Sequence, residues 1–347
     1  MTSEERDSIV VEGLTLKYGE TVALRGIDFR VRPGEIIGFL GPNGAGKTTT
    51  MKILTGYLPA EQGSVRVAGF EVGQKVMEVR RRVGYLPENV PLYEDMLVYD
   101  YLHFVASMRE VAKAKRENRV REVARLTGIE AMLGRAISEL SKGYRQRVGL
   151  AQAIIHEPDV LILDEPTTGL DPNQIVEIRD VIKEIGREKT VIFSTHILQE
   201  VTAVCDRIIL LHRGEIVGDG GLDELSERVA GARGTTVVTF AVDERWSSEE
   251  QRRYLESIPG VEAVEEIHVD RGSQEFRVES TDPDGVRLEL MKREVESPRG
   301  LIGFQCGKPT LEEVFRAFTT GALREEPEES EETEETEETE EMELSHG

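Results

Sequence analysis

The chain has 347 residues, of which 39% are hydrophobic and 31% are charged, and its formal net charge is −23. This length is enough for two packed cores, while the polar composition excludes an integral membrane protein, because no apolar run reaches the roughly 20 residues of a spanning helix. The acidic balance also disfavours a nucleic-acid partner, which calls for a basic face.

Much of the negative charge is concentrated in the C-terminal stretch of the sequence. Residues 325–347 contain 13 Glu and no Lys, Arg or Asp, which leaves about −10 for the rest of the chain. Such a composition cannot bury a core, and we expect a disordered acidic tail over residues 325–347. This tail serves either as an inert, solubilising extension or as a docking segment for a basic surface.

The N-terminus and the cysteines indicate the compartment. The first residues, MTSEERD, are acidic where a secretory signal is basic and then apolar, so we expect a cytosolic protein. Cys205 and Cys306 have no partner at metal-ligand spacing, and we expect them to be buried, reduced thiols. Neither feature indicates an activity.

Residues 8–231 are predicted to form an α/β domain. Residues 9–31 alternate between apolar and polar side chains, which is typical of antiparallel strands joined by turns. Short apolar strands then alternate with helices, which predicts a parallel sheet. The expected elements are strands at 36–40, 160–163 and 191–194, helices at 48–58 and 172–188, and a helical subdomain inserted at about 90–156.

A second unit is predicted over residues 235–320, after a glycine-containing linker near Gly231. Its order of elements is strand, helix, strand, strand, helix, strand, which predicts a small α+β domain of the ferredoxin-like type. The expected elements are strands at 235–242, 261–269, 274–279 and 300–305, helices at 247–257 and 284–296, and a final helix at 310–319.

The first candidate site is the segment GPNGAGKT, which follows a predicted strand and precedes a predicted helix. Glycines are needed there because backbone N–H groups converge on phosphate oxygens, and a Cβ would obstruct that approach. The positive end of the next helix also attracts anions. We therefore expect Lys47 to bind the β- and γ-phosphates of a nucleotide and the Thr48 hydroxyl to bind Mg²⁺. The nucleotide-binding residues of this loop are Gly41, Pro42, Asn43, Gly44, Ala45, Gly46, Lys47, Thr48 and Thr49.

Two later strands end in polar residues that would face the same site. The strand at 160–163 leads to Asp164, which is expected to hold Mg²⁺ through water, and to Glu165, which is expected to act as general base. The strand at 191–194 leads to His196, whose imidazole can donate a hydrogen bond to the γ-phosphate. Ligands of open α/β sheets gather at the carboxyl ends of the strands, so these side chains are expected near the glycine loop.

In this order and spacing, the motifs resemble the ATP-binding subunit of ABC transporters over about Ile9 to Gly231. The segment LSKGY at 140–144 aligns with the family's signature loop, Leu-Ser-Gly-Gly-Gln. The segments LDEP at 163–166 and GLDP at 169–172 follow it, and His196 comes last. The resemblance implies a P-loop ATPase core with a parallel sheet, an antiparallel β subdomain and a helical subdomain. It also implies an ATP hydrolase that uses ATP and Mg²⁺.

The resemblance further implies that a second copy of the chain, or a paralogue, completes each site. In the family two subunits stack head to tail, and the signature loop of one binds the γ-phosphate held by the other. Ser141 would supply its hydroxyl, Gly143 its backbone N–H, and Asp171 would lie at the dimer seam. Ser is also a favoured N-cap residue, so a purely structural helix start is the alternative for Ser141. Tyr18 matches the aromatic residue that stacks on adenine, with a core tyrosine as the alternative.

Some positions depart from the family's usual pattern. Glu88 stands where most relatives have Gln, and its carboxylate would act on the metal or the attacking water. Lys142 and Tyr144 replace the Gly and Gln of the signature, as in a branch that includes drug-export and gliding-motility ATPases. That branch commonly carries a C-terminal domain ending in a helix like TLEEVF, which occurs here at 310–315, with a role in dimer packing or regulation.

A membrane partner is also implied by the resemblance. Residues near 88–101 would form the groove for a coupling helix of integral membrane permease subunits. The exposed apolar residues there would be Leu92, Tyr93, Met96 and Leu97.

The expected function is to drive substrate export through separate membrane subunits, with the chain peripheral on the cytoplasmic face of the cell membrane. The alternative is a soluble mechanical ABC ATPase that acts on ribosomes or DNA. Such proteins usually carry two motif sets or a long coiled coil, and this sequence has neither.

Overall fold

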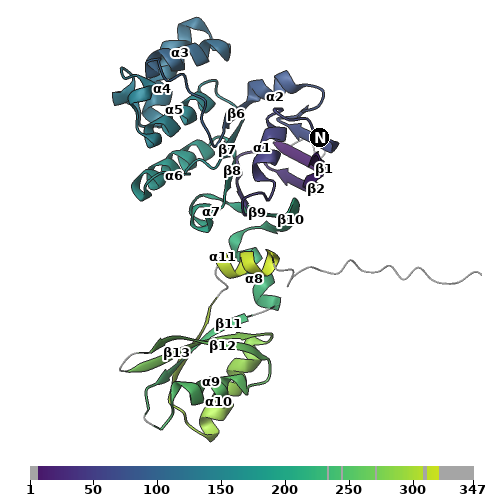
Figure 1. Ribbon diagram of the computed structural model, residues 1–347, viewed down its shortest axis with the longest axis vertical. Coiled ribbons are helices and arrows are strands. Elements are labelled where there is room, and N and C mark those ends of the chain that lie inside the picture. The colour runs from purple at the N-terminus through teal and green to yellow at the C-terminus, as the bar shows by residue number, and fades with distance from the viewer. Residues whose placement is uncertain (1–6, 233, 244, 270–271, 308–310, 320–347) are drawn as a thin grey trace, which may run out of the picture.

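The computed structural model describes residues 7–232, 234–243, 245–269, 272–307 and 311–319 (Figure 1). The predicted acidic tail at 325–347 and Thr310 of the TLEEVF segment lie outside these residues, as does the side chain of Cys306. In the described ranges, no helix combines the length and the apolar content that crossing a bilayer requires.

A six-stranded sheet forms the centre of the N-terminal domain. Five of its strands are parallel, and the edge strand β10 runs antiparallel to β9. β3, β7 and β8 are buried along their whole length, as expected for continuous apolar runs in a sheet that is covered on both faces. The order is β10-β9-β3-β8-β7-β6, with β3 at Ile36–Leu40, β6 at Val83–Leu86, β7 at Val160–Asp164, β8 at Thr190–Thr195, β9 at Arg207–His212 and β10 at Glu215–Gly220.

An antiparallel sheet packs beside the central sheet, with helix α1 (Lys47–Leu54) in the same core. Phe29 of this sheet and Phe39 of β3 contact each other edge to face, with ring centroids 5.1 Å apart. The predicted antiparallel strands at 9–31 are confirmed, whereas the helix after the glycine loop ends at Leu54 rather than at residue 58. The order is β2-β1-β4-β5, with β1 at Ile9–Tyr18, β2 at Thr21–Val31, β4 at Gln62–Val67 and β5 at Phe70–Glu71, followed by α2 at Val76–Arg82.

A helical subdomain lies beside β6 and β7 (Figure 1). Its buried faces share one core with α6 (Pro172–Gly186) and with Leu161 and Phe193 of the sheet. The apolar spacing of the helices explains this, because one stripe of each helix is buried and the opposite face stays polar. Its helices are α3 at Val98–Met108, α4 at Arg116–Leu126 and α5 at Lys142–Ile154.

A four-stranded antiparallel sheet with two helices follows the N-terminal domain. Its strand order is β12-β13-β11-β14, and its chain order is βαββαβ, which confirms the ferredoxin-like prediction. Its elements are β11 at Gly234–Ala241, α9 at Ser248–Glu256, β12 at Val261–Val269, β13 at Ser273–Ser280, α10 at Pro283–Glu296 and β14 at Leu301–Gly307.

The last helix, α11 (Leu311–Thr319), packs on the N-terminal domain rather than on the ferredoxin-like sheet. Its Val314 and Phe318 join Leu40 of β3 and residues of α7 (Leu198–Val204) and α8 (Leu222–Ala232) in one buried cluster. Grouping this helix with residues 235–320 therefore misplaces its contacts. The periodicity of a short amphipathic helix predicts that one face is buried, but it does not identify the surface that covers it.

Candidate functional site

The glycine loop joins the carboxyl end of β3 to α1. Gly46 has a φ of 110°, and a Cβ on Gly41 would collide with the carbonyl oxygen of Leu211, so both positions require glycine. No side chain caps the start of α1. The first backbone N–H groups of this helix therefore remain available to an anion.

Lys47 is 5% exposed and lies at the centre of the loop. Its Nζ donates to the carbonyl oxygens of Gly41 at 2.7 Å and Pro42 at 3.2 Å. The same ammonium lies 3.3 Å from Oε1 of Glu165, which is also buried. These partners keep the buried charge compensated and hold it beside the loop.

Asp164, at the end of β7, is 1% exposed and is fixed by two hydroxyl groups. Its Oδ1 accepts hydrogen bonds from Ser194 Oγ at 2.6 Å and from Thr48 Oγ1 at 3.1 Å. Burial raises the pKa of this carboxyl group, and the two hydrogen bonds oppose that rise. The carboxylate is therefore costly to bury, which is typical of a functional group.

Glu165 follows directly and adopts a left-handed backbone conformation with a φ of 48°. Its backbone N–H donates to Ser194 Oγ at 3.1 Å, and its Oε2 lies 2.9 Å from Nδ1 of His196. A non-glycine residue in this region is strained, and such strain is concentrated at functional sites. The turn brings the carboxylate between Lys47 and His196.

A pocket of about 520 Å³ opens in front of these residues. The loop residues from Asn43 to Thr49 line it, together with Glu165, Thr168 and His196. Two predicted residues lie further out on the wall, namely Glu88, which is exposed after β6, and Tyr18, which is 49% exposed at the end of β1. Gly41 and Pro42 do not line the pocket, and they contribute through the carbonyl groups that hold Lys47.

Three of the predicted nucleotide-binding residues lie away from this pocket. Ser141 caps α5, since its Oγ accepts a hydrogen bond from the backbone N–H of Tyr144 at 3.4 Å. Asp171 caps α6 in the same way, with Gln174 N–H at 3.0 Å. Gly143 packs against the Gln174 side chain, whose end would have to move to admit a Cβ. Within one chain these residues therefore have structural partners of their own.

The oxygen atoms around Asp164 fit Mg²⁺. Asp164 Oδ2 is buried and has no hydrogen-bond partner among the described residues, while Thr48 supplies a hydroxyl group beside it and Glu88 lines the same pocket. Carboxylate and hydroxyl oxygens are the hard donors that Mg²⁺ prefers. In the described part of the chain, no group of three or more His, Cys, Asp and Glu could hold a metal alone.

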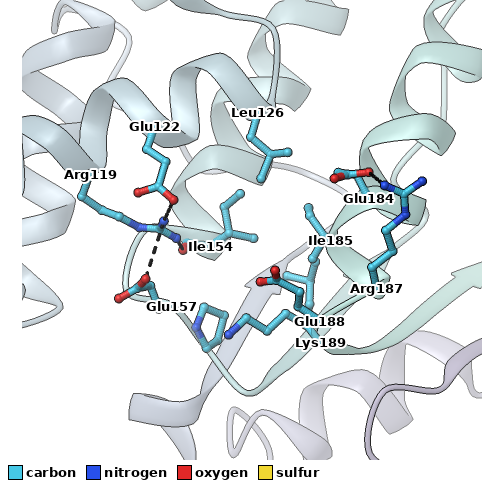
Figure 2. A pocket seen from close by; sticks show the side chains of 12 residues that line it. Arg119, Glu122, Leu126, Ile154, Glu157, Glu184, Ile185, Arg187, Glu188 and Lys189 are labelled. Atoms are coloured by element: carbon cyan, nitrogen blue, oxygen red, sulfur yellow. Dashed lines mark hydrogen bonds and ion pairs between the residues drawn. The ribbon is translucent and has the colours of Figure 1, made fainter.

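A second pocket, of about 280 Å³, lies between α4, α5 and the end of α6 (Figure 2). Its floor is apolar and its rim is charged, but the charges pair with each other: Arg119 with Glu122 at 2.8 Å, and Arg187 with Glu184. It lies at the amino ends of β7 and β8, whereas the P-loop pocket lies at their carboxyl ends. The glycine loop, Glu165 and His196 line the P-loop pocket, and none of the predicted site residues lines the second pocket, so the P-loop pocket is the candidate site.

The sequence analysis did not identify Ser194 and Thr168. Ser194 is fully buried and bonds to both Asp164 and Glu165, and Thr168 Oγ1 donates to Glu165 Oε2 at 3.4 Å. A serine directly after the apolar run VIF of β8 is the signal that could have identified Ser194. Such a residue needs hydrogen-bond partners, and here the partners are Asp164 and Glu165.

Comparisons with known proteins identify the family of the chain. Residues 24–168 match the family model described as ABC transporter. The linearmycin resistance ATP-binding protein LnrL of Bacillus subtilis (strain 168) is 28% identical over 315 residues, which cover 90% of this chain and 99% of that protein. The uncharacterized ABC transporter ATP-binding protein YxlF of the same organism is 35% identical over 254 residues, which cover 73% of this chain and 81% of that protein.

A solved structure of an ATP binding subunit of an ABC transporter is 30% identical to this chain. The match covers 64% of this chain and 93% of the chain in that structure, with a TM-score of 0.59. The shared motifs, their geometry and the two relatives lead to the same assignment. The chain belongs to the ATP-binding subunits of ABC transporters, which are ATP hydrolases.

Proposed function

We propose that this chain binds Mg-ATP in the P-loop pocket and hydrolyses it to drive export through separate membrane subunits. The observation that carries the proposal is the convergence of Lys47, Thr48, Glu165 and His196 on one pocket, with Asp164 buried behind it and bonded to Thr48. These residues come from three strand ends that are distant in the sequence. The group combines a phosphate-binding cation, Lys47, that lies 3.3 Å from the proposed general base, Glu165, with a metal-binding carboxylate, Asp164, that is hydrogen-bonded to Thr48.

Phosphate binding begins at the glycine loop. The free N–H groups at the start of α1 receive the phosphate oxygens, and Lys47 exchanges its carbonyl and carboxylate partners for the β- and γ-phosphates. Tyr18, which is half exposed on the pocket wall, stacks on the adenine ring. The base is thereby held outside the phosphate site.

The γ-phosphate also releases the general base. Before nucleotide binds, both Lys47 and His196 contact the carboxylate of Glu165. In its neutral form the imidazole of His196 has one N–H, and in that form it cannot donate to Glu165 and to the γ-phosphate at the same time. When it donates to the phosphate, Glu165 is free to accept a proton from the water that attacks the γ-phosphorus, and ADP and phosphate are formed.

Mg²⁺ completes the charge balance. Asp164, Thr48 and Glu88 are the residues that would hold it, on the strength of the unpaired Asp164 Oδ2 and the oxygen donors around it. When bound, the ion neutralises negative charge on the phosphates. Glu88 adds a further negative charge to this wall, so we expect a strict requirement for the metal.

A second copy of the chain supplies the rest of the site. Ser141, Gly143 and Asp171 lie away from the pocket of their own chain, and Ser141 is exposed at the N-terminus of α5. We propose that this helix end faces the γ-phosphate bound by the partner, because its positive end attracts an anion. ATP then holds two chains together, and hydrolysis separates them.

The surface for the membrane subunits lies after β6. Tyr93 and Leu97 are 57% and 42% exposed, whereas Leu92 and Met96 are partly buried, so only half of the predicted apolar set is available. Two residues of α3 add to the exposed apolar surface, since the side chains of Phe104 and Met108 are 39% and 68% exposed. Such a surface marks a partner site, which would place the chain at the cytoplasmic face of the cell membrane.

Export is the proposed direction because of the relatives. LnrL is named for resistance to linearmycin, and the match covers nearly the whole of that protein. The 315 aligned residues are more than the ATPase domain contains, so the alignment extends into the ferredoxin-like region. The signature residues Lys142 and Tyr144 support the same branch.

The test is a Glu165→Gln substitution. We expect ATP turnover to be lost, because the amide cannot accept a proton, while the variant still binds ATP and accumulates as an ATP-bound dimer. Size-exclusion chromatography with and without Mg-ATP and a phosphate-release assay measure the two effects. Asp180→Asn, an exposed change on α6, is the control that should behave as the wild type. Unchanged turnover in Glu165→Gln would refute the assignment of the base.

A further inference from the structure

Glu200, in the first turn of α7, is fully buried. Its Oε2 lies 2.6 Å from the hydroxyl oxygen of Thr195, the last residue of β8. That hydroxyl oxygen accepts a hydrogen bond from the backbone N–H of Ile197 at 3.0 Å. Because the hydroxyl group accepts from Ile197, its own hydrogen is free to be donated to Glu200. The three groups form a directed chain that ends on a carboxylate, and charge-assisted bonds of this kind are short and strong.

These hydrogen bonds involve the residues on both sides of His196 in the sequence. Thr195 and Ile197 are the residues on either side of it, and both are attached to the same hydroxyl group. The imidazole itself is 44% exposed and has Glu165 as its partner, at 2.9 Å. The backbone on both sides of the ring is therefore held from the buried side, while the ring faces the pocket.

The helix that carries Glu200 has a fixed position. Val201, the next residue, is fully buried, and a Cβ on Gly38 of β3 would collide with the side chains of Val201 and Cys205. Val201 also belongs to the buried cluster that includes Val314 and Phe318 of α11. α7 is thus packed between the central sheet and the C-terminal helix, and Glu200 projects from a rigid support.

A carboxylate is an energetically unfavourable group at this buried position. Glu200 Oε1 is buried and has no hydrogen-bond partner among the described residues. Burying an ionisable group with an unpaired oxygen is unfavourable, and an apolar side chain of similar size would stabilise the fold better. A role in packing alone therefore does not explain the residue, whereas an anchor for the Thr195 hydroxyl group does.

We propose that Glu200 is a positioning residue for His196, which acts through Thr195 to hold the imidazole where it exchanges Glu165 for the γ-phosphate. This inference rests on the proposed role of His196. Glu200 does not touch nucleotide, and its effect is confined to the placement of the backbone on both sides of the ring.

The test uses the full chain and measures kcat and KM for ATP together with the affinity for a fluorescent ATP analogue. Glu200→Ala should lower kcat at least about tenfold and leave KM and the affinity within about twofold, since displacement by about 1 Å can cost about 100-fold in rate. Glu200→Gln keeps an acceptor oxygen and should recover most of kcat. Gln199→Ala, an exposed change on the same helix, is the matched control and should leave kcat unchanged.

Thr195 provides the independent check. Thr195→Val should reproduce the loss, and Thr195→Ser should restore most of kcat. The double variant Thr195→Val/Glu200→Ala should lose no more than either single variant, because the two residues act as one unit.

Three outcomes would each overturn the inference. In the first, the losses of kcat from the two single changes multiply in the double variant. In the others, Glu200→Ala keeps the wild-type kcat or Glu200→Gln fails to recover it. His196→Gln separates the two proposals. If its turnover equals that of the wild type, the proposed function of His196 fails. If His196→Gln is impaired and Glu200→Ala is not, the positioning role alone fails.

Discussion

At the scale of single residues, the site combines groups that are unfavourable for the fold. Asp164 is buried with one unpaired oxygen, and Glu165 occupies a strained backbone conformation. Lys47 is buried against carbonyl groups that a phosphate would replace. Each of these features costs stability in the absence of nucleotide, and we expect each of them to serve the proposed binding of Mg-ATP.

The prediction for Asp164→Asn follows from its raised pKa. The pKa of this carboxyl group is higher in the folded chain than in the unfolded chain. Its contribution to the stability of the fold is therefore lost as the pH rises through the folded-state pKa. At neutral pH, the asparagine variant should therefore have a higher free energy of unfolding than the wild type.

Chemical denaturation without nucleotide measures this change, and a phosphate-release assay should show that Mg-dependent hydrolysis is lost. Asp180→Asn, which is exposed, should alter neither quantity. A variant that is less stable than the wild type without nucleotide would contradict the prediction.

Contiguous motifs were the predictable part of the site. The glycine loop, the Asp-Glu pair and His196 each follow a strand with a central apolar run, so their place at the carboxyl ends of the sheet followed from the sequence. Ser194 and Glu200 were not predicted, because their roles depend on tertiary pairing. Asp164 and Ser194 meet only because β7 and β8 pair in a particular register.

At the scale of elements, α11 supports the nucleotide site from behind. Its buried cluster includes Leu40, the residue before the glycine loop, and Val201 in the helix after His196. Arg228 of α8 covers the Phe318 ring at 5.3 Å. The C-terminal helix therefore packs against the two segments that present the loop and the histidine, although it lies far from both in the sequence.

Phe318→Ala should lower the free energy of unfolding by about 3 kcal/mol, because it leaves a cavity behind the loop. Phe315, which is only partly buried in the same cluster, provides the comparison, and Phe315→Ala should cost clearly less. Urea unfolding of the two variants measures the difference. Equal losses would indicate that α11 is held by its surface rather than by this cluster.

At the scale of the whole molecule, His156 joins the helical subdomain to the central sheet. It follows α5, and its Nε2 lies 3.1 Å from the carbonyl oxygen of Val83 at the start of β6. Burial, together with the nearby Arg109, lowers the pKa of His156 to about 4. The ring is therefore neutral in the folded chain at physiological pH.

This pKa predicts an acid-dependent loss of stability. An unfolded chain has a histidine pKa of about 6.5, so between pH 6.5 and 4 it binds a proton that the folded chain does not bind. Stability should fall as the pH decreases through this window. At pH 5 the wild type should have lost about 1 to 2 kcal/mol more than His156→Gln, relative to pH 7. Urea unfolding at both pH values checks the prediction, and equal losses in the two proteins would refute it.

The ferredoxin-like unit is attached at one place. Thr235 at its beginning pairs with Gly307 at its end, and the helices on either side, α8 and α11, belong to the same buried cluster. The unit is therefore an excursion of the chain whose two ends lie side by side, the arrangement in which inserted domains are best tolerated. Evolution can exchange or lose such a cassette while the energy-converting core stays intact, and each part is free to diverge at its own pace.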